Sequence, residues 1–456
     1  MLAAVILFLK TVMPTVLYFG WIIITLLSVF KRAEWGLLLM VALLPQPNIY
    51  YQFYIFPMGE DMLDISFFCI LLGIVVQRGR LVKTGSMAII SLYLLLSYVA
   101  LWQVSMRFSL PSPLTTNNPI LIRWKDFAQM IFLYFLAVNA FKEEDAHKRA
   151  ITLMALVLLF IGIRGFRAFV AGDAFSEENR YEGPFWRVSL GSNHYAAFMV
   201  HYAATMLGCF FFEKKFRFRI LFGMAVFFCV YAVLFAYSRG AYAAAMVALT
   251  FYSLIHKRSL LIVVGVIIFT WNTLLPVTVV QRITMTQTES GEIESSASKR
   301  VDLWGNAFNL FMENPILGVG YNGFQMTMNA LQTELTDTHN YYLKILSEQG
   351  IIGFLVFLLL LLKALRQGWK LFKTGSSPFY QGLGLAFLGT IIAVIITNAF
   401  GDRWSYLVLG GYFWILWGIV DRGIINSESA ELESSEILLE ETSSSNDQAS
   451  DVPAFP

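Results

Sequence analysis

The stretch Ile351–Leu362, IIGFLVFLLLLL, is apolar on every side of any helix or strand that it could form. Because polar and apolar residues do not alternate in it, it does not fit a strand of a membrane β-barrel. Apolar runs near the ~20 residues that a helix needs to cross a bilayer recur along the chain. Only 14% of the 456 residues are charged, against roughly 25% in soluble domains. The sequence therefore predicts an all-α polytopic integral membrane protein.

The hydropathy pattern predicts about 12 or 13 transmembrane helices, the short apolar segment at 33–45 being the uncertain one. The candidate spans lie near 11–30, 33–45, 62–77, 86–104, 121–141, 150–170, 190–212, 219–236, 239–255, 259–276, 340–363, 379–399 and 405–421. Cys69, Cys209 and Cys229 fall inside such spans, so we expect them to pack rather than to form disulfides. The first 30 residues show no small-residue cleavage site and predict no cleavable signal peptide.

Positive charge is unevenly distributed. Basic clusters recur in alternate loops, which the positive-inside rule assigns to the cytoplasm. They are Lys31-Arg32, Arg78–Lys83, His147–Arg149, Lys214–Arg219, His256–Arg258, Lys363–Lys373 and Arg422. Residues 426–456 hold six Glu, two Asp and no Lys or Arg, so removing them raises the net charge from +2 to +10. We expect residues 1–424 to form the membrane domain and residues 425–456 to be a disordered acidic cytoplasmic tail.

The longest connection on the outward side is 277–339, and a loop of this length is usually functional or disordered. Its residues Ser298–Met312 have the pattern of an amphipathic helix, which Asn314-Pro315 should end. Gly318–Tyr321 (GVGY) then predicts a tight turn. A phosphate-binding glycine loop is the alternative there, although the spacing matches no nucleotide motif.

His339 lies where this polar loop meets the apolar helix beginning near residue 340. Imidazole exchanges protons near neutral pH, so His339 is a candidate base. Alternatively, His339 is an aromatic side chain in contact with water at the membrane interface, without a catalytic role. Asp337 or Thr338 is expected to cap the helix and to place His339 in its first turn, where the helix dipole lowers its pKa.

Arginines gather at outward helix ends. Arg239 stands at a tight junction of two apolar helices, where it needs a partner or a wet cavity, unless it reaches lipid phosphates. Arg300 and Trp304 are four residues apart on the loop helix, so the indole can brace the guanidinium; a solvated face is the alternative. Guanidinium groups suit phosphate, so these residues predict a phosphorylated, membrane-delivered ligand. Further outward arginines are Arg164, Arg167, Arg180, Arg187 and Arg403.

The helix after His339 carries Lys344 and Glu348, four residues apart, and we expect them to form a neutralised ion pair. Gly350 and Gly353 on the same helix are interpreted as close-packing points. The sequence contains no HExxH, GxSxG or Walker motif and no outward DxD pair, so no metal or other cofactor is predicted.

The order of these motifs resembles the O-antigen ligase and polymerase superfamily between about residues 190 and 364. The motifs are Gly191–His194 (GSNH), Ser238–Ala241 (SRGA), Lys299-Arg300 with Trp304, Asn314–Gly320 (NPILGVG) and His339-Asn340 followed by Glu348, Gly350 and Gly353. Residues 1–185 agree with the family only in hydropathy.

The resemblance implies a metal-independent, inverting glycosyltransferase of the bacterial inner membrane that acts on the periplasmic side. It would move a glycan from undecaprenyl diphosphate to an acceptor hydroxyl. His339, Arg239 and Arg300 are the expected catalytic residues. The expected substrate-binding residues are Asn193, Trp304, Tyr321, Asn340, Arg187 and Arg403.

Three functions stay open. The first is an O-antigen ligase that joins polysaccharide to lipid A–core, and the second is a polymerase that uses the growing glycan as acceptor. The third is a transporter of lipid-linked glycans, although internal repeats typical of transporters are absent. The expected partners are the lipid-linked donor, the glycan or lipid A–core acceptor and membrane lipids, with no nucleic acid.

Overall fold

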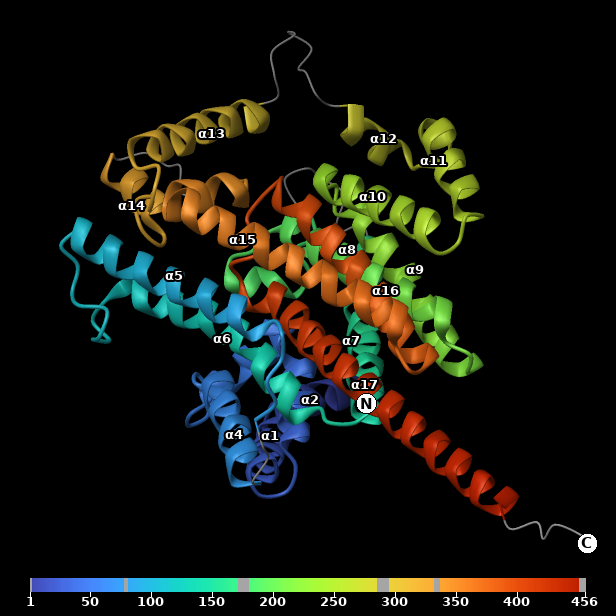
Figure 1. Ribbon diagram of the computed structural model, residues 1–456. Coiled ribbons are helices and arrows are strands. Elements are labelled where there is room, and N and C mark those ends of the chain that lie inside the picture. Colours follow the sequence, from blue (N-terminus) through green and yellow to red (C-terminus); the bar gives the residue numbers. More distant parts are fainter. Residues whose placement is uncertain (1, 78–80, 171–179, 285–294, 332–336, 451–456) are drawn as a thin grey trace, which may run out of the picture.

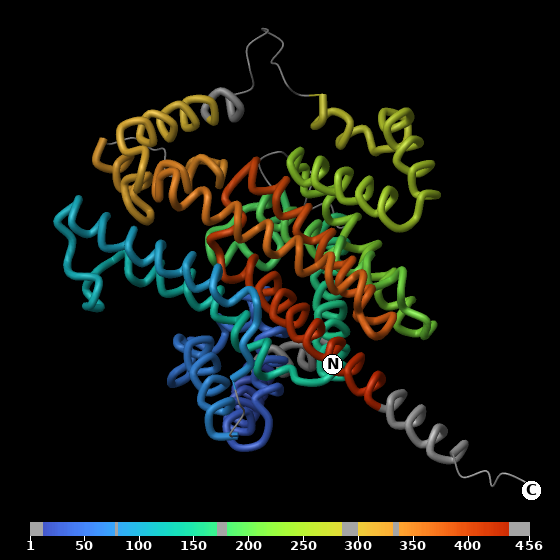
Figure 2. The backbone as a smooth tube through the Cα atoms, viewed as in Figure 1, coloured from blue at the N-terminus to red at the C-terminus, as the bar shows by residue number. Residues whose placement is uncertain are grey.

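The computed structural model describes residues 2–77, 81–170, 180–284, 295–331 and 337–450, and every regular element in these ranges is a helix (Figures 1 and 2). The first helices are α1 (Leu2–Phe30), α2 (Ala33–Leu43), α3 (Pro47–Tyr50), the 3₁₀ helix η1 (Tyr51–Ile55), α4 (Met62–Val76), α5 (Met87–Arg107), α6 (Pro119–Ala140) and α7 (Glu144–Val170). The rest are the 3₁₀ helix η2 (Gly183–Val188), α8 (Ser192–Phe212), α9 (Phe216–Phe235), α10 (Arg239–Ile255), α11 (Leu260–Leu274), α12 (Val277–Thr284), α13 (Ser295–Glu313), α14 (Gly323–Ala330), α15 (Tyr341–Thr374), α16 (Pro378–Asn398) and α17 (Leu407–Ser450).

Eight helices in the described ranges are long and apolar enough to cross a membrane, and they are α1, α5, α7, α8, α9, α15, α16 and α17. The pair α11 and α12 meets the same criterion together but is bent by 102°. The apolar helices α2, α4 and α10 are shorter, and α6 carries three charged residues near its start. The all-α membrane class is therefore confirmed, whereas a count of about 12 spans is not.

The centre of the bundle is formed by α8, α16 and α17, whose side chains are mostly buried. Helix α16 packs against α8, α10 and α15, and α17 packs against α6. Small residues bring α8 and α16 close together, because a Cβ atom added to Gly208 would lie 2.4 Å from the Cα atom of Ala386. On α17, the rings of Trp414 and Trp417 are stacked, with centroids 5.5 Å apart.

Two cavities are lined by segments that the charge pattern assigns to opposite sides of the membrane. Basic residues from 148–149 and 214–217 line one cavity, of about 540 Å³, together with residues 377–379. Another cavity, of about 740 Å³, is lined in part by residues from connections predicted to face outward, among them Tyr51, Ser189 and Asp337. Residues of these two basic clusters and residues of the outward connections therefore line separate cavities. Which end faces the cytoplasm stays a prediction.

The long outward connection contains the helix expected from its pattern. Helix α13 covers the predicted range and ends at Glu313, one residue before Asn314-Pro315. Its apolar side forms a small core with the turn and helix that follow; this core consists of Leu303, Ala307, Leu310, Val319, Phe324 and Met328. Residues 285–294 and 332–336 of this connection lie outside the described residues.

The acidic tail, expected to be disordered from residue 425, continues as helix α17 to Ser450. Figure 1 shows the C-terminal part of α17 leaving the bundle. Residues 451–456 lie outside the described residues. The Glu and Ser residues of 428–436 are compatible with a helix. Low hydrophobicity in this segment was therefore not sufficient to predict a disordered backbone.

Helix α15 is broken at Gly350, which has φ +62° and ψ −164°. A Cβ atom at Gly350 would lie 2.3 Å from the carbonyl oxygen of Ile316. The carbonyls of Ser347 and Glu348 accept the amides of Val319 and Gly320 at 2.8 Å. The 315–320 segment is therefore inserted at the break near Gly350. Because this segment joins α13 to α14, its hydrogen bonds hold both helices against α15. Gly350 is a close-packing point, as expected, but it also ends the regular helix.

Replacing Gly350 with alanine is expected to lower the free energy of unfolding by at least about 1–2 kcal/mol, the cost of a left-handed conformation for a residue with a Cβ. The overlap with Ile316 adds to this loss. Thermal unfolding of the purified protein in detergent measures the change. Gly265→Ala in α11 is the matched control, because nothing lies within 4 Å of its added Cβ. Equal melting temperatures for the two variants would contradict the prediction.

Candidate active site

His339 lies just before α15 in a left-handed backbone conformation, with φ +49°. Its amide donates to Asp337 Oδ1 at 3.3 Å, and its Nδ1 atom is 3.3 Å from Asp337 Oδ2. Asn340 caps α15, since its side-chain oxygen accepts two amides of the first turn. The prediction that Asp337 or Thr338 caps the helix, with His339 in its first turn, is therefore wrong. Asp337 instead holds the imidazole ring.

The surroundings of His339 favour its neutral form. Burial lowers the pKa of His339 below its ordinary value of 6.5, Asp337 raises it, and Arg300 and Arg403 lower it again. The direction agrees with the expectation from the helix dipole, but burial is the main cause. The carboxylate beside Nδ1 favours a proton on that atom, which leaves the lone pair on Nε2. His339 is therefore able to accept a proton near pH 7.

Two arginines from distant parts of the chain act on His339. Arg300 is on α13, and Arg403 is in the short connection between α16 and α17. Arg403 is buried, its amide donates to Asn398 Oδ1 at 3.0 Å, and its guanidinium donates to the carbonyl of Asp402 at 3.2 Å. Burial lowers the pKa of Arg403. Cations held in this way are suited to an anionic ligand.

Arg239 is the first residue of α10, directly after the tight turn that joins α9 to α10. Tyr237 in this turn is left-handed, with φ +51°. Its carbonyl accepts Arg180 Nη1 at 2.9 Å and Arg282 Nε at 3.4 Å. The turn is thus held by two arginines, which gives Arg180 a structural role that the sequence left open. Close packing of Gly240 on Phe400 fixes the start of α10 against the α16–α17 connection.

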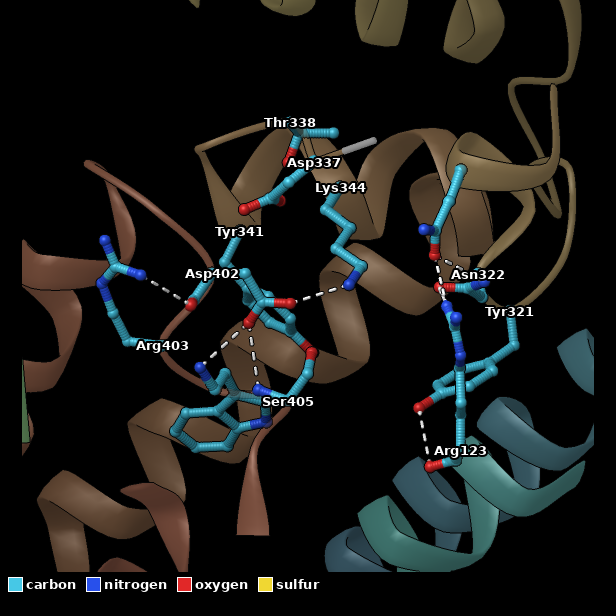
Figure 3. Close-up of polar contacts among 12 residues, drawn as sticks. Arg123, Tyr321, Asn322, Asp337, Thr338, Tyr341, Lys344, Asp402, Arg403 and Ser405 are labelled. Carbon is cyan, nitrogen blue, oxygen red and sulfur yellow. Dashed lines mark hydrogen bonds and ion pairs between the residues drawn. The ribbon is translucent and has the colours of Figure 1, made fainter. Parts of the chain in front are cut away.

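Lys344 and Asp402 form a buried ion pair, with Lys344 Nζ 2.7 Å from Asp402 Oδ2 (Figure 3). Asp402 Oδ1 accepts the amides of Trp404 and Ser405 at 3.1 and 3.0 Å. Burial raises the pKa of Asp402, but Lys344 and the hydrogen bonds from Ser405 lower it below its ordinary value. The expected pair of Lys344 with Glu348 is therefore wrong.

The other predicted binding residues occupy varied environments. Tyr321 is buried and donates from its hydroxyl to the carbonyl of Arg123 at 3.4 Å. Asn193 lies in the first turn of α8, and Trp304 packs on the small core of α13 and α14. Arg187 is exposed on η2, with its guanidinium 4.2 Å from the ring of its neighbour Trp186. Their part in binding stays a prediction.

Two polar residues close to this group were not predicted. Asp402 was missed although it adjoins Arg403 in a connection of only a few residues between apolar helices, a signal that the sequence did offer. His194 has its ring edge-on to Tyr406, with centroids 5.3 Å apart. Both ring nitrogens of His194 are buried, and the backbone carbonyl of Asp402 is close enough to interact with the ring.

The site opens into the cavity of about 740 Å³, where Asp337, Lys344, Ser405 and Tyr406 form part of the wall. This volume is within the range of ligand pockets, roughly 300–1,000 Å³. Within the described ranges, no three His, Cys, Asp or Glu side chains are grouped to hold a metal ion. The arrangement therefore combines a base, several cations and a space for a sizeable polar ligand.

Residues 224–358 match the family model described as O-Antigen ligase. The matched range includes Arg239, Arg300 and His339, and it ends within α15. Over these residues, the match supports the resemblance to the O-antigen ligase superfamily that the order of motifs indicated. No curated protein matches the chain.

Proposed function

We propose that this chain, a member of the O-antigen ligase superfamily, transfers a glycan from undecaprenyl diphosphate to an acceptor hydroxyl on the periplasmic side of a bacterial inner membrane. The proposed acceptor is lipid A–core, and the growing glycan of a polymerase is the alternative. One observation carries the proposal: His339 is held by Asp337, which lines a cavity of about 740 Å³, and its charge state is influenced by Arg300 and Arg403.

The reaction uses His339 as the base. The acceptor oxygen forms a bond to the anomeric carbon of the glycan while the bond from that carbon to the diphosphate oxygen breaks. The electron pair of the broken bond leaves with undecaprenyl diphosphate, and the acceptor proton passes to Nε2 of His339. Because attack and departure are in line, the anomeric centre is inverted.

The arginines act on the leaving group. Negative charge grows on the departing diphosphate oxygen, and fixed cations stabilise it most strongly where water is excluded. Arg300 and Arg403 share the surroundings of His339, and Arg239 lies at the start of α10, which packs on the same α16–α17 connection. These three residues are proposed to bind the diphosphate and to stabilise its charge, with no metal ion required.

The environment of His194 supports the proposal that a polar ligand binds beside it. Buried nitrogens without partners are rare in folded proteins, because an unmade hydrogen bond costs free energy. The carbonyl of Asp402 can accept from only one ring nitrogen of His194, and the ring packs edge-on against Tyr406, which lines the cavity. A hydroxyl or phosphate oxygen of the bound substrate is proposed to satisfy the other nitrogen.

Replacing Arg300 or Arg239 with alanine is expected to slow transfer about 10²–10³-fold, the usual loss when one electrostatic donor to a transition state is removed. Initial rates with purified protein, lipid-linked oligosaccharide and acceptor measure this loss. Arg217→Ala is the matched control, since Arg217 lines the cavity among the basic segments. Equal rates for Arg300→Ala and Arg217→Ala would contradict the proposed role of Arg300.

The same assay separates the two acceptors. A single larger product on lipid A–core supports the ligase, whereas a ladder that grows by repeat units supports the polymerase.

A further inference from the structure

The cavity of about 740 Å³ that we call the lateral chamber extends from the candidate active site towards the N-terminal helices. Its wall combines Asp337, Lys344, Ser405 and Tyr406 with residues from η1, α4 and α6 that neither the family match nor the sequence motifs cover. In Figure 3, Lys344 lies between Arg403 on one side and Arg123 on the other. Asp337, on the chamber wall, is 3.3 Å from His339 Nδ1, so a ligand that reaches this part of the wall lies near His339.

Tyrosines form a platform on one wall of the lateral chamber. The rings of Tyr51 and Tyr54 are stacked, with centroids 4.5 Å apart, and Tyr50 is tilted against Tyr51 at 5.4 Å. Tyr54 is exposed and Tyr51 is half-buried, so both present ring surface to the chamber. A tyrosine ring offers an apolar face and a polar hydroxyl, which matches the alternating C–H and O–H surface of a sugar ring.

The cations of the lateral chamber are already engaged. Lys125 Nζ is 2.5 Å from Asp64 Oδ2, and Gln129 donates to Asp64 Oδ1 at 2.6 Å. Lys344 is paired with Asp402. Arg123 donates to the side-chain oxygens of Asn322 and Gln325. An anionic ligand would have to compete with these contacts.

Carboxylates outnumber cations on the chamber wall. The acidic lining residues are Glu60, Asp61, Asp64, Asp126 and Asp337, and the basic ones are Arg123, Lys125 and Lys344. Charge of this sign repels phosphate and carboxylate groups, whereas carboxylate oxygens accept hydrogen bonds from neutral hydroxyls. Arg300 and Arg403, whose charges act on His339, have the opposite preference. The chamber wall thus suits an uncharged sugar chain, and the two arginines suit an anionic diphosphate.

We propose that the lateral chamber binds an uncharged oligosaccharide segment of a transfer substrate and discriminates against sugars that bear phosphate or carboxylate groups. Sugar rings stack on Tyr51 and Tyr54, and their hydroxyls donate to Asp126 and to the lone pairs of Asp64 that Lys125 and Gln129 leave unused. This assignment rests on the proposed glycosyl transfer. The segment belongs either to the lipid-linked donor or to the acceptor, which have the same chemistry here.

Binding without transfer is the first test. Full-length protein in nanodiscs is titrated with a panel of neutral tetrasaccharides and with their 6-phosphate and uronic acid counterparts. We expect at least one neutral member to bind more tightly than its charged counterparts, and Tyr51→Ala with Tyr54→Ala to weaken it about tenfold. Tyr51→Phe with Tyr54→Phe keeps the stacked rings and should bind nearly as the wild type does. Trp35→Ala, an exposed aromatic residue outside the chamber, is the second control.

A panel in which the charged sugars bind as tightly as the neutral ones, or in which the double alanine variant binds as the wild type does, would overturn the proposal. Transfer kinetics then identify the source of the segment. In the double alanine variant, a raised KM for the lipid-linked donor assigns the chamber to the donor, and a raised KM for the acceptor assigns it to the acceptor. If neither KM changes, the proposal fails even though transfer itself stands. A further outcome separates the two proposals. If sugar binding depends on Tyr51 and Tyr54 while His339→Ala transfers glycan at the wild-type rate, the chamber binds sugar but the proposed function is wrong.

Discussion

Replacing His339 with alanine is expected to slow glycan transfer about 10²–10⁴-fold, the contribution of a well-placed general base. The substitution removes the Nε2 lone pair but no part of the buried core, because the His339 side chain is 43% exposed. Binding of the lipid-linked donor should therefore change far less than the rate. Single-turnover transfer by purified protein, together with donor binding measured separately, tests this split. A variant that binds and transfers as the wild type does would remove His339 from the mechanism.

The pH dependence of transfer distinguishes a base from a residue that only orients the acceptor. The neutral imidazole is the active form, so the rate should fall as the pH drops through the pKa of His339, which lies below 6.5. Asp337 raises this pKa, so Asp337→Asn should move the acid limb to lower pH. Arg300 lowers it, so Arg300→Gln should move the limb to higher pH while also slowing the reaction. An acid limb that stays in place in both variants would show that His339 is not the titrating group.

Replacing Asp402 with asparagine is expected to lower the free energy of unfolding by about 3–5 kcal/mol, because it leaves the charge of Lys344 buried without its partner. Asparagine keeps an oxygen that accepts the amides of Trp404 and Ser405, so the change isolates the ion pair. Chemical or thermal unfolding in a single detergent measures the loss. Asp402 is fully buried, so solvent does not compensate for the missing charge.

A double variant provides the control for this prediction. Lys344→Met with Asp402→Asn removes both charges, and it should recover most of the stability that Asp402→Asn alone loses. If the double variant is no more stable than the single one, the ion pair is not the source of the effect.

The sequence predicted the class of fold and the neighbourhood of His339 for physical reasons. Continuous apolar runs have few alternatives to membrane helices, and the amphipathic pattern of α13 was strong enough to define its range. Arg300, Arg403 and His339 were each predicted as site residues, and the structure places the two arginines within electrostatic reach of the histidine. The number of spans was harder to predict, because α2, α4 and α10 are apolar but too short to be certain crossings.

The errors came from contacts between residues distant in the sequence. Glu348 stands four residues after Lys344 and offered a local partner, while the real partner, Asp402, is 58 residues away. The break at Gly350 was also hidden, because the apolar pattern continues on both sides of it and only the inserted 315–320 segment shows why the helix opens. The lateral chamber was missed for the same reason: its wall is assembled from segments between residues 50 and 408.

Reconstitution in liposomes distinguishes a glycosyltransferase from a transporter. Purified protein is reconstituted in liposomes with an undecaprenyl diphosphate-linked oligosaccharide and an acceptor, and the glycosylated acceptor and the free undecaprenyl diphosphate are quantified together. We expect the wild type to form both products in equal amounts and His339→Ala to form neither at a comparable rate. The opposite result is a wild-type protein that moves the lipid-linked glycan across the bilayer and leaves the carrier–glycan bond intact. This result would contradict glycan transfer and identify a transporter.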